Sequence, residues 1–113
     1  MPKRRERVAP PPRTGGWDLR YGTNDAVAGS NVCAAAPTNS RTAWERITSD
    51  PRQRDARQHP LRGSLGRRIV NGTPMEQWQY EVIGAGRLWY CIDDEHRTVW
   101  LTDAVTGHPK ATE

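Results

Sequence analysis

The sequence lacks several features that would place it in a large or membrane-bound class of protein. It has no phenylalanine, only two cysteines and only 35% hydrophobic residues in 113 positions, which fits one small domain. No stretch approaches the roughly 20 apolar residues that cross a bilayer, and the N-terminus lacks the apolar core of a secretory signal. We therefore expect a cytoplasmic protein with no membrane-inserted segment.

The two cysteines argue against a metal site and against a disulfide framework. Cys33 and Cys91 are far apart, and neither belongs to a cluster of His and Cys. Zinc sites and disulfide frameworks need grouped cysteines, so we expect two reduced thiols. The sequence indicates no metal ion and no other cofactor.

Tryptophan and arginine are abundant instead. Five tryptophans and three tyrosines supply much of the area that the chain can bury, which predicts a small, tryptophan-rich core. The net charge of +4 divides unevenly, because residues 1–13 carry +4, 14–40 carry −1, 41–70 carry +5 and 71–113 carry −4. This asymmetry is typical of a surface that binds polyanions, although solvated surface arginines would give the same pattern.

Periodicity along the chain predicts the order of its elements. Residues 1–16 contain three consecutive prolines and are expected to form a flexible, basic, proline-rich tail, and residues 17–113 a single domain. Alternation predicts a first strand at 17–21. Two helices follow at 25–36 and 38–49 and would form a hairpin.

The remaining chain is expected to form strands. A polar connection at 51–60 leads to strand patterns at 67–70, 75–83, 87–92 and 98–102, which predict an antiparallel meander of three or four strands. The expected fold is therefore α+β: a strand, a two-helix hairpin and the meander, with the helices packed on one face of the sheet.

The motifs of the C-terminal half follow an order found in one known family. They are Leu-Arg-Gly at 61–63, Trp-Gln-Tyr-Glu-Val at 78–82, Gly-Arg-Leu-Trp-Tyr-Cys-Ile-Asp-Asp at 86–94, Val-Trp-Leu at 99–101 and Gly-His-Pro-Lys at 107–110. In this order the chain resembles the RelE/ParE superfamily, the toxins of bacterial type II toxin–antitoxin systems. Position 79 departs from the family pattern, with Gln where many members have Arg.

The resemblance implies a toxin that inhibits translation as a ribosome-dependent, metal-independent mRNA endoribonuclease. It also implies a cognate antitoxin, which would cover the basic face in a toxin–antitoxin hetero-oligomer, with the ribosome and mRNA as further partners. Two alternatives stay open. One is a DNA gyrase inhibitor of the ParE type, and the other is a non-catalytic protein that binds nucleic acid or a protein partner.

Arg87, His108 and Lys110 are the candidate catalytic residues. The resemblance places Arg87 at the family's strand arginine, and a guanidinium can hold two phosphate oxygens at once. The alternative is an exposed strand arginine paired with Glu76 or Glu81. His108 is a candidate acid and base because an imidazole exchanges protons near neutral pH, and Lys110 could reach the same phosphate. Both could equally be solvated residues without a role.

Four residues of the basic middle segment are candidate RNA contacts. Arg62, Arg67 and Arg68 would form a track for the RNA backbone, or else protect a strand edge with charge. His59, near Arg57 and Arg62, is a reserve candidate base, or else a surface residue of a polar loop.

Three further features are interpreted as structural. For Trp89 and Trp100, core packing is favoured over base stacking. Cys91 is expected to be a buried small hydrophobe, and the acidic turn at 93–95 to be solvated.

Overall fold

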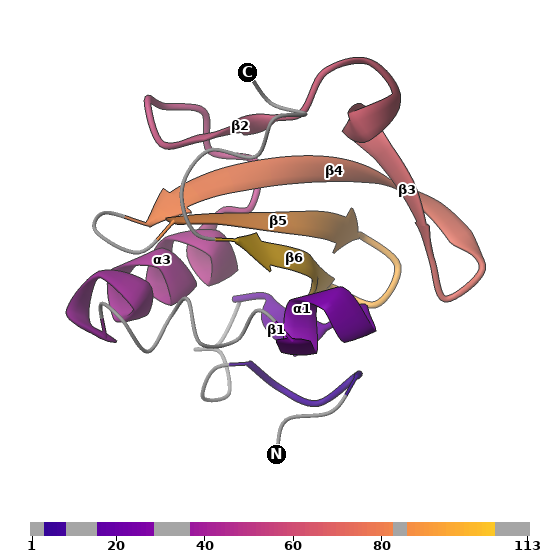
Figure 1. The fold of residues 1–113 in the computed structure, drawn as a ribbon, viewed down its shortest axis with the longest axis horizontal. Coiled ribbons are helices and arrows are strands. Elements are labelled where there is room, and N and C mark those ends of the chain that lie inside the picture. The colour runs from indigo at the N-terminus through magenta and orange to yellow at the C-terminus, as the bar shows by residue number, and fades with distance from the viewer. Residues whose placement is uncertain (1–3, 9–15, 29–36, 83–85, 106–113) are drawn as a thin grey trace.

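The computed structural model describes residues 4–8, 16–28, 37–82 and 86–105, and these form a six-stranded sheet with helices against it (Figure 1). In chain order the elements are β1 (Asp18–Tyr21), α1 (Asn24–Ala28), α3 (Pro37–Ser49), β2 (Gln58–Pro60), the 3-10 helix η1 (Gly63–Gly66), β3 (Arg67–Val70), β4 (Thr73–Val82), β5 (Gly86–Asp93) and β6 (Thr98–Val105). The strands lie in the order β1-β6-β5-β4-β2, and β3 pairs with the first part of β4. β1 runs parallel to β6, whereas the other pairs are antiparallel.

The expected α+β fold with a two-helix hairpin is wrong, whereas the expected antiparallel meander is present as β3, β4, β5 and β6. α1 has five residues, and α3 is the only longer α-helix among the described residues. Positions 29–36 of the expected first helix lie outside the described residues. The sheet is mixed and dominates the fold. The sheet is larger than expected because segments far apart in the sequence pair with each other. β2 forms in a polar stretch with no strand periodicity because the ten-residue β4 supplies its hydrogen-bond partners.

Several local predictions are confirmed. α3 covers the helix predicted at 38–49, buries Ala43 and Ile47, and ends directly before Asp50 and Pro51. The turn predicted at Asn71-Gly72 joins β3 to β4, with φ angles of 52° and 81° at its two residues. Such positive φ angles match the twist of a two-residue hairpin, and Asn-Gly adopts them most readily.

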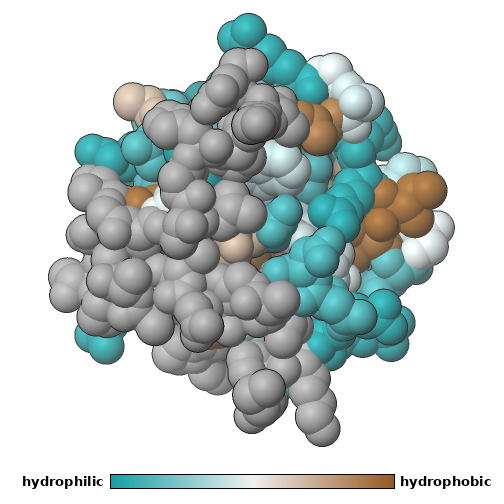
Figure 2. Space-filling view, viewed as in Figure 1, coloured by the Kyte–Doolittle hydropathy of each residue, from teal (hydrophilic) through white to brown (hydrophobic). Residues whose placement is uncertain are grey.

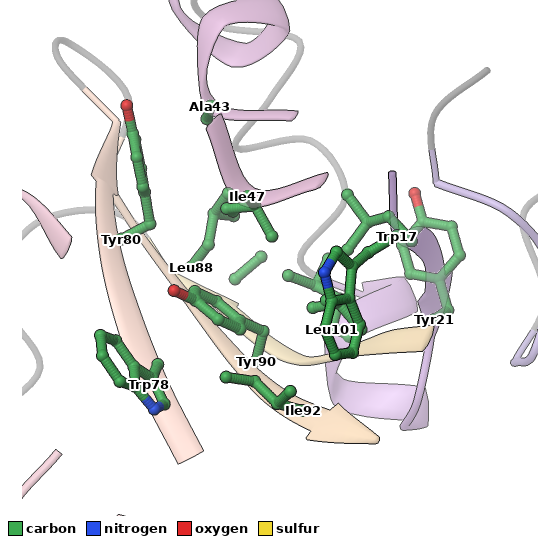
Figure 3. Packing of buried hydrophobic residues seen from close by; sticks show 14 of the residues in the cluster. Trp17, Tyr21, Ala43, Ile47, Trp78, Tyr80, Leu88, Tyr90, Ile92 and Leu101 are labelled. Carbon is green, nitrogen blue, oxygen red and sulfur yellow. The ribbon is translucent and has the colours of Figure 1, made fainter. Parts of the chain in front are cut away.

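We call the side of the sheet that packs against α1 and α3 the inner face, and it carries the main core. Figure 3 shows Ala43 and Ile47 directed from α3 toward Leu88 and Tyr90 of β5. The buried members of this core are Trp17, Leu19, Tyr21, Ala26, Ala43, Ile47, Trp78, Tyr80, Val82, Leu88, Tyr90, Ile92, Val99, Leu101 and Ala104. Two of the five tryptophans thus belong to it, with aromatic side chains providing much of its volume.

Residues 4–8 lie against β1. The N–H of Val8 donates to the carbonyl of Leu19 over 2.8 Å, and Arg7 forms an antiparallel bridge with Arg20. The guanidinium groups of Arg7 and Arg20 both reach the Asp18 carboxylate, at 2.9 and 2.7 Å. These described residues of the N-terminal segment therefore extend the sheet beyond β1.

In the view of Figure 2, the described residues that can be seen are mostly hydrophilic. Hydrophobic residues gather at the right edge of that view, on the side where Figure 1 places the β3–β4 hairpin. Ile69 of β3 is the large hydrophobic side chain that stays exposed within the described ranges, at 69%. No helix in these ranges has the length and apolarity to cross a membrane.

Candidate functional site

The side of the sheet opposite the helices, which we call the outer face, is built from the alternate residues of β4 and β5. Because side chains alternate along a strand, residues between those of the core point away from the helices. On β4 these are Gln77, Gln79 and Glu81, and on β5 they are Arg87, Trp89 and Cys91. The strand register pairs Gln77 with Cys91, Gln79 with Trp89, and Glu81 with Arg87.

A row of hydrogen-bonded side chains crosses the middle of the outer face. The indole N–H of Trp89 donates to Oε1 of Gln79 over 2.9 Å. On its other side, Nε2 of Gln79 lies 3.4 Å from Nε2 of His59, which pairs with Gln79 in the β2–β4 register. Trp89 and Gln79 are buried, whereas His59 is exposed. The row therefore runs from a buried indole to an imidazole in solvent.

Arg87 and Glu81 form the neighbouring row. Nη2 of Arg87 lies 4.0 Å from Oε2 of Glu81, and only 8% of Arg87 is exposed. The pairing with Glu81 was one of the two sequence interpretations of Arg87, but the exposed position expected with it is not observed. The N–H of Glu81 donates to the carbonyl of Arg57 over 2.8 Å, so the exposed Arg57 lies beside this row.

A third row contains Gln77 and Thr102. The Thr102 hydroxyl donates to Oε1 of Gln77 over 2.6 Å, and Nε2 of Gln77 donates to the carbonyl of Leu65 over 2.8 Å. Thr102 lies on the outer face because it follows Leu101 of the inner core, and side chains alternate along a strand. The β5–β6 register shifts between Trp89 and Tyr90, which leaves Thr102 as the extra residue of a β-bulge. These bonds hold both ends of the Gln77 amide and fix its orientation.

Beyond Gln77 the outer face becomes apolar. Val70, Met75, Cys91 and Trp100 form a small second core there. Burial raises the pKa of the Cys91 thiol to about 12, so Cys91 is the inert buried residue that the sequence predicted. Trp89 and Trp100 are both buried as well, as predicted.

The structure brings some of the predicted site residues together and separates others. Arg87 and His59 lie on the outer face, and so does the half-buried Arg68, because it pairs with Met75. Arg67 pairs with Glu76 and points to the opposite side, and Arg62 is exposed in the loop before η1. The predicted track of three arginines is thus divided between surfaces.

His108 and Lys110 lie outside the described residues, so their predicted roles stay predictions. Sequence reasoning also missed Gln79 as the neighbour of His59 and Trp89 as the hydrogen-bond donor to Gln79. The available signal was the alternation of Gln77, Gln79 and Glu81, which is a polar stripe on one side of an otherwise apolar strand.

The acidic turn at 93–95 is engaged in contacts rather than fully solvated. Asp93 accepts hydrogen bonds from the backbone N–H of His96 and the indole of Trp100, and its Oδ2 lies 2.8 Å from Nδ1 of His96. Asp94 accepts two bonds from Arg52. Within the described ranges, no three side chains of His, Cys, Asp or Glu group as metal ligands would.

A comparison with protein-family models, curated proteins and solved structures found no match. The candidate site is therefore described by its geometry alone: a hydrogen-bonded polar face that carries Arg87 on β5 and His59 on β2, in adjacent rows on either side of β4.

Proposed function

We propose that the outer face binds RNA and cleaves it, with Arg87 holding the phosphate and His59 acting as the general base. The observation that carries this proposal is the shared face of the two residues, in adjacent rows of the sheet. Two strand spacings of about 4.8 Å separate their backbones sideways. The two residues are also one row apart, about 7 Å along the strands. The proposal requires the long arginine side chain to reach toward the imidazole so that both contact one phosphodiester.

The chemistry follows from the two groups. His59 removes the proton of a ribose 2′-hydroxyl, and the 2′-oxygen attacks the adjacent phosphorus. The bond to the 5′-oxygen breaks, giving a 2′,3′-cyclic phosphate and a 5′-hydroxyl that takes its proton from water. Arg87 donates to the non-bridging oxygens, where negative charge accumulates in the transition state. His59 then returns its proton to solvent.

The biological role in this proposal is that of a toxin that acts in the cytoplasm on ribosome-bound mRNA and is neutralised by an antitoxin. This part rests on the sequence motifs that resemble the RelE/ParE superfamily. Arg57 and Arg68 add positive charge at the borders of the proposed RNA site, which favours a polyanionic ligand.

The test is induction of the chain in a heterologous bacterium while translation, mRNA 5′ ends and DNA supercoiling are followed together. Wild type should produce new mRNA 5′ ends and block translation. His59→Asn and Arg87→Gln should each lower the cutting rate by about 100-fold or more. Arg41→Gln, a matched loss of charge at an exposed position of α3, should cut like wild type.

Other outcomes contradict the proposal in distinct ways. Intact mRNA with blocked supercoiling would indicate a gyrase inhibitor. Intact mRNA with normal translation and normal supercoiling would indicate a non-catalytic binding protein. Circular dichroism of each purified variant shows whether a lost activity reflects a lost fold.

A further inference from the structure

We infer that Trp89 and Gln79 are positioning residues that fix the tautomer of His59, with the proton on Nδ1 and an unprotonated Nε2. The tautomer follows from donor and acceptor chemistry along the row. Its role in cleavage rests on the proposed function.

The first step fixes the Gln79 amide. An indole nitrogen is only a donor, so the Gln79 atom 2.9 Å from Nε1 of Trp89 must be the carbonyl oxygen. A flipped amide would set two donors against each other in a site where both residues are buried. Such a buried donor without an acceptor costs about 1–3 kcal/mol. Trp89 therefore fixes which end of the amide faces outward.

The second step carries this orientation to the imidazole. With Oε1 toward Trp89, the amide nitrogen of Gln79 faces Nε2 of His59, at 3.4 Å. An amide nitrogen only donates, so Nε2 of His59 accepts and carries no proton. In a neutral imidazole the proton is then on Nδ1.

The contact on the other side of the imidazole ring supports the same tautomer. Nδ1 of His59 lies 3.1 Å from the carbonyl oxygen of Pro60. A carbonyl oxygen only accepts, so this contact is a hydrogen bond when Nδ1 carries the proton. Two independent neighbours, Gln79 and Pro60, thus select the same tautomer.

The consequence is a His59 ring whose unprotonated nitrogen is on the side of the outer face. A general base needs that lone pair, and the opposite tautomer would present an N–H to the substrate hydroxyl. The 3.4 Å separation is long for a hydrogen bond, so a ribose hydroxyl can replace Gln79 at Nε2. The displaced amide then has its N–H groups beside the phosphate.

The experiment is nitrogen NMR of the full chain with 15N-labelled histidine, with the His59 ring assigned by comparison with His59→Asn. The neutral imidazole of wild type should show a protonated Nδ1 and an unprotonated Nε2. Gln79→Glu keeps the shape but replaces the outward donor by an acceptor, so Nε2 should carry a proton. Trp89→Phe removes the indole donor and should give a mixture of both tautomers.

The matched control is Trp100→Phe. It also removes a buried indole N–H, but one that donates to Asp93 rather than to Gln79, and it should leave the His59 tautomer unchanged. Should Trp89→Phe fail to fold, the nearly isosteric Gln79→Glu variant decides the question alone. A proton on Nε2 in wild type, or no shift in Gln79→Glu, would overturn the inference.

Cleavage rates of the same proteins separate this inference from the proposed function. The positioning role predicts that Trp89→Phe loses roughly tenfold or more in rate, as part of the 10²–10⁴-fold that a general base contributes. A shifted tautomer with an unchanged rate would refute that role. Wild type that never cuts RNA would refute the proposed function, while the NMR result still decides the tautomer.

Discussion

The Tyr90 hydroxyl donates a hydrogen bond to the carbonyl oxygen of Pro51 over 2.8 Å, although the two residues are 39 positions apart. The same hydroxyl accepts from the side-chain amide of Gln58 over 2.9 Å, and that amide also donates to the carbonyl of Asp50 over 3.0 Å. Burial raises the pKa of Tyr90, which keeps its proton in place as a donor. These bonds attach the segment after α3 and the short strand β2 to the middle of the sheet.

We expect Tyr90→Phe to lower the free energy of unfolding by about 1–3 kcal/mol, because the Pro51 carbonyl loses its donor in a buried site. Urea denaturation measures the change. Tyr80→Phe is the control, since Tyr80 is a buried inner-face tyrosine whose hydroxyl makes no hydrogen bond to the described residues. Equal losses in the two variants would show that the Tyr90 hydroxyl has no special role.

Arg52 joins an acidic side chain of β4 to one in the turn between β5 and β6. Its Nε donates to Glu76 over 2.8 Å, and its two terminal nitrogens donate to Asp94 over 2.9 and 2.8 Å. These hydrogen bonds lower the pKa values of both carboxylates. Because the three side chains are partly exposed, solvent screens the interaction, and we expect Arg52→Gln to cost about 1 kcal/mol at pH 7.

The pH dependence of that cost has a defined sign. Carboxylates with lowered native pKa values stabilise the fold above their unfolded values of 4.5 and 3.8, and lose this contribution as the pH falls through the native values. The difference between wild type and Arg52→Gln should therefore shrink when urea unfolding is repeated at about pH 3. A constant difference at both pH values would contradict the ion-pair explanation, and Arg41→Gln should show no difference at either.

The contact between Asp93 and His96, in the turn between β5 and β6, predicts a raised pKa for His96. Asp93 raises the pKa of His96 above the usual 6.5, first through the hydrogen bond to Nδ1 and then through its charge. An NMR titration should show this raised value, and Asp93→Asn should return it toward 6.5. Asp94→Asn, the same change at the next residue, should leave His96 unaffected. No drop in Asp93→Asn would refute the contact.

The sequence predicted the elements that have their own hydrophobic periodicity. Alternation identified β1, β4, β5 and β6, and the helical spacing of Ala43 and Ile47 identified α3. β2 has only three residues and no periodicity of its own. It exists because it pairs with β4, and such pairing between distant segments leaves no mark on a short polar stretch.

The arrangement of the candidate site depends on the register between strands even more than the fold does. The motif position of Arg87 was visible in the sequence, but its burial and its row beside Gln79 and His59 follow from how β2, β4 and β5 align. The hydrogen bond from Thr102 to Gln77 likewise depends on how β6 aligns beside β5, where one extra residue forms a β-bulge. A shift of one position would turn each of these side chains to the other face, so the hydrogen-bonded rows could not be foreseen.

The most direct test of the proposed function is the chemistry of RNA ends after incubation of the purified chain with ribosomes programmed with mRNA. We predict cut mRNA with 2′,3′-cyclic phosphate and 5′-hydroxyl ends, formed about 10²–10⁴-fold more slowly by His59→Asn. Uncut mRNA, cuts with 3′-hydroxyl ends, or a His59→Asn variant as fast as wild type would contradict catalysis on the outer face.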